Sequence, residues 1–205
     1  MEVLIFDYMS ECTEHEVQRM LPLVSVQRRK QALRYKHTFG QFCCLKSWLM
    51  VRELLERVGY NRFEFDEFRF NPNGKPYIEG GPYFSISHCK EGIAVAVDDE
   101  PIGIDIEGIR RADKELIERV MNDEEQAQIK SDRDFTRFWT QKEAVVKMQG
   151  TGIQSFEQLQ CLLSGCRNTG VPEYRIETIE HEKYIYSIAY GKLCSIGAEV
   201  QAADL

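Results

Sequence analysis

Apolar residues recur at helical spacing in two long segments of this chain. We expect one helix over Phe39–Arg57 and a second over residues 133–149, ending at Gly59 and Gly150 respectively, because glycine is the usual residue just past a helix end. The first helix has a continuous apolar face, formed by Phe42, Leu45, Leu49, Leu54 and Leu55. Such a face is typical of a helix that covers a hydrophobic core.

Shorter segments alternate between apolar and polar residues, which is the spacing of β-strands. We expect strands over residues 1–8, Phe63–Phe70, Phe84–His88, Ile93–Val97, Gly103–Glu107, Tyr174–Ile179, Tyr184–Tyr190 and Ile196–Val200. The pair Asn73-Gly74 predicts a tight turn. The charged stretch Asp113–Lys130 predicts two short helices, with Asn122-Asp123 as the break and cap between them.

A polar break at residues 98–101 separates two halves of similar content. Each half is expected to hold a few antiparallel strands and one long helix, which indicates an α+β fold. We therefore predict an N-terminal subdomain over residues 1–98 and a C-terminal subdomain over residues 99–205. No sequence repeat supports an internal duplication.

Composition and charge narrow the class of protein. The chain has 205 residues, 43% of them apolar, and a net charge of −7, so a general nucleic-acid binder is not expected. No apolar run is long enough to span a bilayer, and the first residues lack a signal-peptide pattern, so we expect a cytoplasmic protein. The seven cysteines include no CxxC pair and the four histidines are scattered, which argues against a zinc site.

Candidate chemistry lies on the predicted strand at 103–107 and on the second long helix. Asp105 and Glu107 share the polar face of the strand, while Glu143 and Lys147 stand four residues apart on the helix. If the strand and the helix pack together, three carboxylates and one lysine converge, and such carboxylates need a cation, with Mg²⁺ suited to oxygen ligands. The alternatives are a solvated strand face and an ordinary helical ion pair. We expect Asp132 or Asp134 to cap this helix.

Several residues of the first half could contact phosphate. Gly74, Lys75 and Pro76 follow the predicted turn, and Ser87 and His88 end a strand. Taken alone, these are a hairpin tip and a structural histidine. A basic cluster within residues 28–36 is likewise either a solvated helix face or a phosphate contact.

Four motifs in this order resemble the signature of the Sfp-type 4′-phosphopantetheinyl transferases. They are GKP at 74–76, SISH at 85–88, GIDIE at 103–107 and WTQKEAVVK at 139–147. The resemblance covers about residues 28–153. One departure lies between the last two motifs, because 33 residues separate Asp105 from Trp139 (139 − 105 − 1 = 33), fewer than expected for the family.

The resemblance implies a fold, a reaction and roles for the residues. The fold would be a pseudo-twofold pair of similar subdomains, each an antiparallel sheet packed with a long helix. The active site would lie between the two subdomains, and the protein would be a monomer. The reaction would be transfer of 4′-phosphopantetheine from coenzyme A to a serine of an acyl or peptidyl carrier protein. Asp105, Glu107 and Glu143 would hold Mg²⁺. Lys147 would contact the α-phosphate, and Glu143 would also accept the serine proton.

The same resemblance assigns the coenzyme A contacts. They would be Arg28, Lys46, Gly74, Lys75, Pro76, Ser87, His88 and Lys147. Gln31 stands where a second basic residue is expected, and Lys46 would take over the role of that residue. Two other interpretations stay open: another Mg²⁺-dependent phosphotransferase, and a non-catalytic nucleotide-binding or scaffold protein. For the carrier we expect a docking surface on 108–130, where basic and apolar residues are interleaved.

Overall fold

The computed structural model describes residues 1–61, 68–163 and 174–191. The predicted strand at Ile196–Val200 lies outside the described residues, as does the Phe63–Phe65 part of the strand predicted at Phe63–Phe70.

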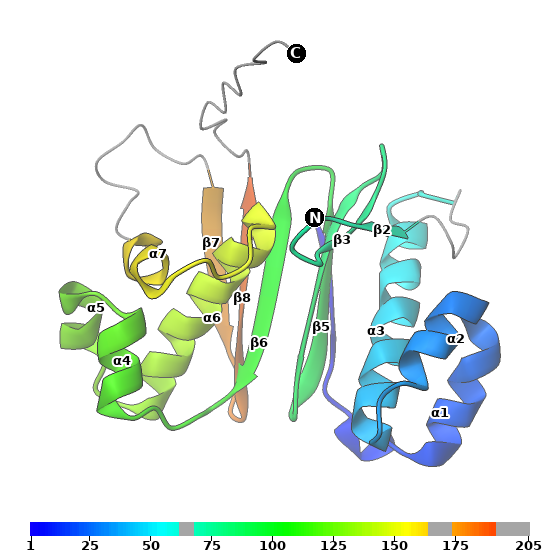
Figure 1. Cartoon of the computed structure of the whole chain (residues 1–205), viewed down its shortest axis with the longest axis horizontal. Helices are drawn as coiled ribbons and strands as arrows, with labels where there is room; N and C mark the ends of the chain where they lie inside the picture. The colour runs from blue at the N-terminus through cyan, green and yellow to red at the C-terminus, as the bar shows by residue number, and fades with distance from the viewer. Residues whose placement is uncertain (62–67, 164–173, 192–205) are drawn as a thin grey trace, which may run out of the picture.

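Two three-stranded antiparallel sheets form the centre of the molecule, and a long helix covers the outer face of each (Figure 1). The first sheet has the order β1 (Glu2–Phe6), β5 (Gly92–Asp98), β4 (Tyr83–Cys89). The second has the order β6 (Ile102–Gly108), β8 (Tyr184–Gly191), β7 (Tyr174–Glu180). Helix α3 (Thr38–Arg57) covers the first sheet and α6 (Asp132–Gln149) the second.

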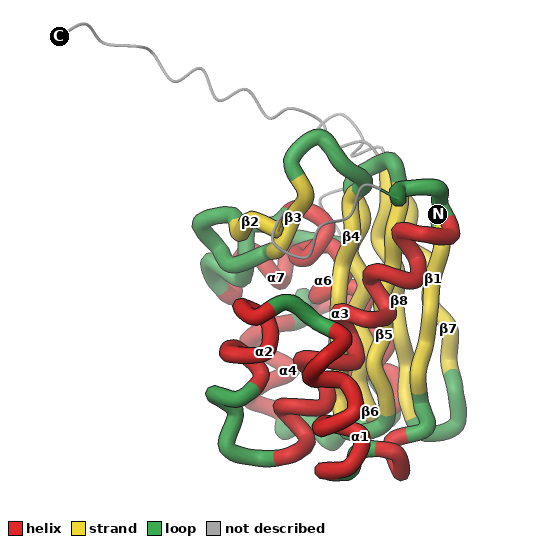
Figure 2. Tube along the Cα trace, turned by 90° about the vertical axis from the view of Figure 1, so that its right-hand side faces the viewer, coloured by secondary structure: helices red, strands yellow, loops and turns green. Residues whose placement is uncertain are grey.

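Smaller elements surround the two long helices. Helices α1 (Glu14–Met20) and α2 (Val26–Ala32) lie beside α3, on the near side in Figure 2, with short 3-10 turns η1 (Met9–Glu11) and η2 (Leu21–Leu23). Helices α4 (Lys114–Val120), α5 (Asp123–Gln128) and α7 (Phe156–Cys161) flank α6, and β2 (Phe68–Phe70) pairs with β3 (Pro76–Ile78) in a separate hairpin.

The apolar core is divided by these layers. The buried apolar side chains of α3 pack on Val95, Val97 and Phe84 of the first sheet. Between the sheets, Ala94 and Ala96 of β5 meet the isoleucines of β6. On the far side, α6 packs on β8. The alternation predicted for the strands therefore follows from their position, because successive residues of a strand face different layers.

The structure confirms most of the predicted elements. Both long helices are present, as are the strands at 84–88, 93–97 and 103–107, and Asn122 caps α5 as predicted. The predicted cap of α6 was wrong: the Ser131 hydroxyl, and not Asp132 or Asp134, accepts the backbone N–H of Asp134 at 3.2 Å. The Asp134 carboxylate instead accepts from the Ser131 hydroxyl and from the Lys130 backbone. Whether a pseudo-twofold axis relates the two halves remains a prediction.

Within the described parts of the chain, no helix is both long and apolar enough to cross a membrane.

Candidate active site

Gly103 allows helix α6 to lie directly on strand β6. A Cβ atom at this position would collide with the backbone of Ala144 and Met148 on α6. The glycine therefore brings two backbones closer than any side chain would permit. This close approach places Lys147, one turn along α6, next to Asp105, two residues along β6.

Three polar side chains from three elements meet beneath this contact. The Lys147 ammonium donates to Asp105 Oδ1 at 2.6 Å and to Ser87 Oγ at 2.8 Å, and Ser87 Oγ donates to Asp105 Oδ1 at 2.7 Å. Asp105 is only 3% exposed, and its second oxygen, Oδ2, is buried with no hydrogen-bond partner among the described residues. A buried carboxylate oxygen without a donor is costly, so a further cation or donor is expected there.

Two more carboxylates lie in the same electrostatic environment. Burial raises the pKa of Glu107, and the negative charge of Asp105 raises it further. Burial also raises the pKa of Glu143, with Asp105 as the next cause and Glu107 adding to it. The negative charge of Asp105 therefore disfavours the ionisation of both glutamates, which places the three acids in one electrostatic environment.

The carboxylates are nevertheless not gathered into a preformed metal site. Among the described residues no group of three acidic, histidine or cysteine side chains has the arrangement to hold a metal ion. Glu107 Oε1 is engaged elsewhere, since it accepts from the Trp139 indole at 3.3 Å and lies 3.8 Å from Arg110 Nη1.

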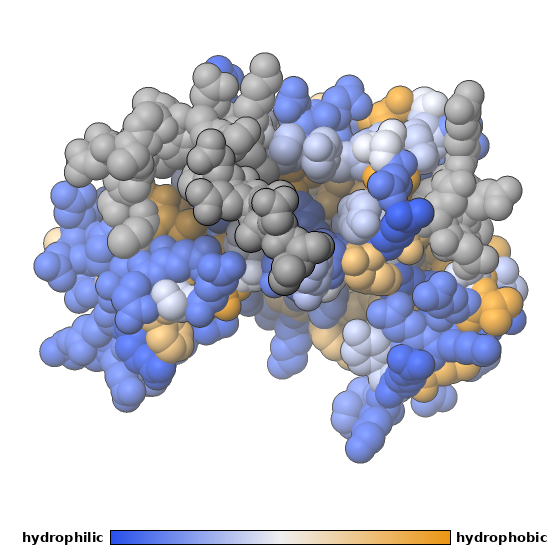
Figure 3. All heavy atoms as spheres, turned by 45° about the horizontal axis from the view of Figure 1, so that its top comes forward, coloured by the Kyte–Doolittle hydropathy of each residue, from blue (hydrophilic) through white to orange (hydrophobic). Residues whose placement is uncertain are grey.

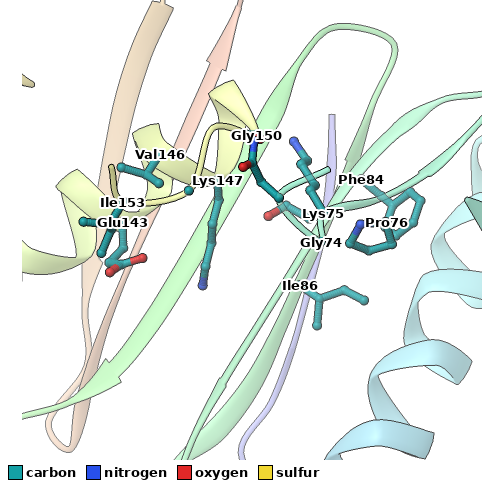
Figure 4. Close-up of a pocket in the computed structure, with 13 residues that line it drawn as sticks. Gly74, Lys75, Pro76, Phe84, Ile86, Glu143, Val146, Lys147, Gly150 and Ile153 are labelled. Atoms are coloured by element: carbon teal, nitrogen blue, oxygen red, sulfur yellow. The ribbon is translucent and has the colours of Figure 1, made fainter. Parts of the chain in front are cut away.

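A cavity of about 420 Å³ opens beside these residues (Figure 4). Side chains from both halves line it, among them Lys75, Pro76, Ser85, Ile86, Glu143 and Lys147. Figure 3, which looks onto the upper edge of the molecule, shows apolar surface between hydrophilic side chains in its middle part. A concave site with a few converging charged groups is the usual form of a small-molecule site.

The loop between β2 and β3 is fastened to the C-terminal end of α6. Asn71 Nδ2 and Asn73 Nδ2 donate to the Gly150 carbonyl at 2.8 and 3.0 Å. The Lys75 ammonium donates to the carbonyls of Ile102 and Met148 at 3.1 and 3.2 Å. The Met148 and Gly150 carbonyls lie at the end of α6, where carbonyl groups lack partners within the helix, and the lysine and the two amides bind them. Burial lowers the pKa of Lys75 to about 8.

Comparison of the chain with known proteins identifies its family. Residues 101–195 match the model of the 4′-phosphopantetheinyl transferase superfamily. The chain is 30% identical to the 4′-phosphopantetheinyl transferase psf-1 of Bacillus pumilus, over 67% of this chain and 63% of the relative. It is 29% identical to gsp of Aneurinibacillus migulanus, over 74% and 67%, and 28% identical to Sfp of Bacillus subtilis, over 69% and 66%.

The chain belongs to the Sfp-type 4′-phosphopantetheinyl transferase family. The matched region spans about two thirds of the length of these relatives, between 63% and 67%.

Within this family member, the structure brings some of the predicted site residues together and leaves others apart. Asp105, Ser87 and Lys147 touch one another, and Gly74, Lys75, Pro76, Glu143 and Lys147 line one cavity. Desolvation and the nearby positive charge of Lys147 lower the pKa of His88, whose ring meets the Phe39 ring edge-on.

Arg28 and Lys46 lie on the helical layer of the N-terminal half. The Arg28 guanidinium stacks on Trp48, 3.5 Å from the ring centroid, and borders a small groove with Gln31, Phe68 and Phe70. Burial lowers the pKa of Arg28 to about 10. Lys46 Nζ lies 4.1 Å from the centroid of the Phe6 ring. Neither residue lines the cavity beside Lys147, so their contact with coenzyme A remains a prediction.

Sequence reasoning missed the polar contacts that hold α6 in place. Lys142 is fully buried and donates to Glu125 Oε1 at 2.8 Å and to the Leu159 carbonyl at 2.5 Å. The Thr140 and Ser187 hydroxyls share a hydrogen bond of 2.8 Å. Both pairs join residues far apart in the chain, so no local spacing could have indicated them.

Proposed function

We propose that this protein transfers 4′-phosphopantetheine from coenzyme A to a serine of an apo acyl or peptidyl carrier protein, releasing adenosine 3′,5′-bisphosphate. The observation that carries the proposal is the contact of Lys147, Asp105 and Ser87, one residue from each of three motifs. These residues lie beside a cavity that both halves line. Family membership supports the same reaction class.

The acidic residues fit a magnesium ion. Asp105, Glu107 and Glu143 would hold it. Oxygen ligands suit Mg²⁺, and Asp105 Oδ2 has no hydrogen-bond partner among the described residues. Burial and the nearby charge of Asp105 raise the pKa values of Glu107 and Glu143. When bound, the ion would neutralise negative charge on the pyrophosphate of coenzyme A.

The remaining groups of the site would bind and orient the substrate. Lys147 would contact the α-phosphate, where negative charge gathers as adenosine 3′,5′-bisphosphate leaves. Glu143 would accept the proton of the attacking serine, and its raised pKa suits that role. Ser87, His88 and Lys75 would donate to phosphate oxygens, and Gly74 and Pro76 would shape the wall beside them.

The N-terminal half would supply the other coenzyme A contacts, through Arg28 and Lys46. We also propose that the chain divides into subdomains 1–98 and 99–205 and that a pseudo-twofold axis relates them. The protein would act in the cytoplasm as a monomer and would not bind nucleic acid. Size-exclusion chromatography with light scattering tests the oligomeric state.

Carrier docking is proposed for the basic residues of Gly108–Lys130. The apolar residues of this segment, Leu116, Ile117, Val120 and Met121, pack with Phe135 in a core beneath α6. They are therefore not free to form the apolar part of a docking surface. Arg111 and Lys114 are exposed and remain available to an acidic partner.

One experiment separates the proposed transfer from the two alternatives. The protein is incubated with coenzyme A, Mg²⁺ and several apo carrier proteins, and the carriers are weighed by mass spectrometry. We expect the phosphopantetheine mass to be added, and EDTA or Asp105→Ala to prevent it. Asp99→Asn, an exposed acid in the turn before β6, is the matched control. Absence of the added mass on every carrier would contradict the proposal and favour another phosphotransferase or a binding protein.

A further inference from the structure

The carboxylate at the centre of the site already has a cation. The Lys147 ammonium lies 2.6 Å from Asp105 Oδ1, and the Ser87 hydroxyl both accepts from the ammonium and donates to the same carboxylate oxygen. The Asp105 side chain is 4% exposed and the Lys147 side chain 29%. The chain therefore supplies its own lysine as counter-charge to the buried aspartate, and the lysine keeps contact with solvent.

The neighbouring carboxylate on the same strand is held in a comparable way. Glu107 accepts from the Trp139 indole at 3.3 Å and lies 3.8 Å from the Arg110 guanidinium. Asp105 Oδ2, in contrast, has no partner among the described residues. Two of the three acids thus lie beside a cation of the protein itself, Asp105 beside Lys147 and Glu107 beside Arg110.

We propose that Lys147 is the resident cation of this site and that the pyrophosphate of coenzyme A must draw it away before a divalent metal binds tightly. The inference rests on the proposed function for the identity of the anion. A divalent ion placed on Asp105 would be repelled by an ammonium that touches the same carboxylate. An anionic substrate gives the lysine another partner, and its long flexible side chain makes the exchange possible without moving α6.

Metal and coenzyme A binding are therefore coupled. Each ligand strengthens the binding of the other by the same factor, since the coupling free energy between two sites is reciprocal. Ser87 is a positioning residue here, because its hydroxyl contacts both Lys147 and Asp105 and so holds the ammonium on the carboxylate. The arrangement makes tight metal binding depend on coenzyme A.

Manganese is a suitable probe, because the free ion is counted directly by electron paramagnetic resonance. The full chain is titrated with Mn²⁺, with and without coenzyme A and with no carrier present. For the parent we expect weak binding alone and binding at least about tenfold tighter with coenzyme A, within the usual range of about 5- to 150-fold. Calorimetry of coenzyme A binding, with Mn²⁺ or with EDTA, should give the same factor.

Variants at position 147 test whether Lys147 causes the weak Mn²⁺ binding of the parent. Lys147→Met should bind Mn²⁺ alone about tenfold more tightly than the parent, and coenzyme A should add little further. Lys147→Arg keeps a cation and should keep Mn²⁺ binding weak. Lys183→Met, an exposed lysine, is the matched control and should behave as the parent. Circular dichroism establishes that each variant is folded.

Two results would overturn the inference. One is equal Mn²⁺ affinity of the parent with and without coenzyme A, which requires no variant. The other is unchanged, weak Mn²⁺ binding in folded Lys147→Met. Carrier modification is measured separately, so the two proposals can fail independently. Carrier modification without coupling contradicts only the resident-cation role, and coupling without modification of any carrier contradicts only the proposed transfer.

Discussion

Helices α3 and α6 occupy equivalent layers, one on each sheet, yet they bury different kinds of side chain. The buried residues of α3 are apolar except for Ser47, and they include Phe42, Leu45, Leu54 and Leu55. Helix α6 buries two threonines and a lysine, and it also presents Glu143 and Lys147 to the cavity.

The difference shows where each half obtains its stability. A buried polar group costs free energy unless it has a partner. On α6 each such group has one: the Thr136 hydroxyl donates to the Asp132 carbonyl, the Thr140 hydroxyl shares a hydrogen bond with Ser187, and Lys142 pairs with Glu125. The N-terminal half is stabilised mainly by apolar packing on α3, whereas the C-terminal half depends in addition on specific polar pairs around α6.

The largest effect is expected at the fully buried lysine of α6. Lys142→Met leaves Glu125 buried without its cation and should lower the free energy of unfolding by about 3–5 kcal/mol. Urea denaturation measures this. The control is Lys46→Met on α3, where a half-buried lysine over Phe6 should contribute about 1 kcal/mol or less.

Removing both charges of the Lys142–Glu125 pair tests whether the unpaired charge of Glu125 causes the loss of stability. Lys142→Met combined with Glu125→Leu should recover most of the loss, because no unpaired charge remains. If Lys142→Met alone is as stable as the Lys46→Met control, polar pairing does not distinguish the two helices.

The second prediction concerns Glu143. Glu143→Gln should slow transfer by about 100-fold or more, which corresponds to about 2.7 kcal/mol, if the residue accepts the serine proton. The same change should raise Tm at pH 7. The folded pKa of Glu143 is raised, so its contribution to stability is present below its ordinary pKa and is lost as pH rises through the raised value. At pH 7 the ionised acid therefore opposes folding, and glutamine removes that charge.

Thermal denaturation at pH 7 and pH 4 measures this effect, and the gain in Tm should disappear at the lower pH. Glu53→Gln on α3, an exposed acid paired with Arg57, is the control and should change neither transfer nor Tm appreciably. A lower Tm at pH 7 for Glu143→Gln would show that its charge stabilises the site instead.

A smaller effect is expected where the first half reaches α6. Lys75→Ala should raise the KM for coenzyme A about tenfold, through loss of one charge-assisted contact worth about 1.5 kcal/mol. The folded pKa of about 8 adds a pH dependence: the ammonium loses its proton as pH rises through 8, so the KM of the parent should rise there toward that of the variant.

Steady-state kinetics between pH 7 and pH 9 measures both effects. Lys183→Ala, an exposed lysine in the β7–β8 turn, is the control and should leave KM and its pH profile unchanged. A fall in kcat with constant KM would mean that Lys75 acts in the transition state. Loss of stability alone would mean that Lys75 only holds the end of α6 in place.

The smallest effect is expected at the exposed basic residues near α4. Arg111→Glu with Lys114→Glu should raise the KM for carrier protein about two- to fivefold and leave coenzyme A binding unchanged, because such charges mainly guide association. Arg110 is left intact because it lies beside Glu107. Titration with an apo carrier measures the effect, with Lys183→Glu as the control. Unchanged carrier kinetics would place docking on another surface.

Local patterns in the sequence predicted the elements but not the contacts between them. The apolar face of α3, the Asn73-Gly74 turn and the alternation around Asp105 each depend on neighbouring residues, so spacing indicated them correctly. The convergence of Asp105 with Lys147 could also be anticipated, because the polar faces of one strand and one helix were known.

Contacts between distant segments could not be found in this way. The phosphate contact expected of Lys75 stays a prediction, and no spacing indicated that its ammonium also binds the Met148 carbonyl, 73 residues away. Lys142 resembles any helical lysine until its burial against Glu125 is seen. Even the cap of α6 was misassigned, because serine and aspartate at neighbouring positions are equally good candidates by type.

The fastening of the β2–β3 loop to the end of α6 bears on any attempt to divide the gene. A fragment beginning at residue 99 would contain the three carboxylates and Lys147, and so would carry most of the acidic chemistry. It would lack Asn71, Asn73 and Lys75, which bind the carbonyls at the end of α6, and Ser87, which touches Asp105. Two fragments split at this point could restore the site only by reassembling, which makes the boundary a natural place for a complementation system.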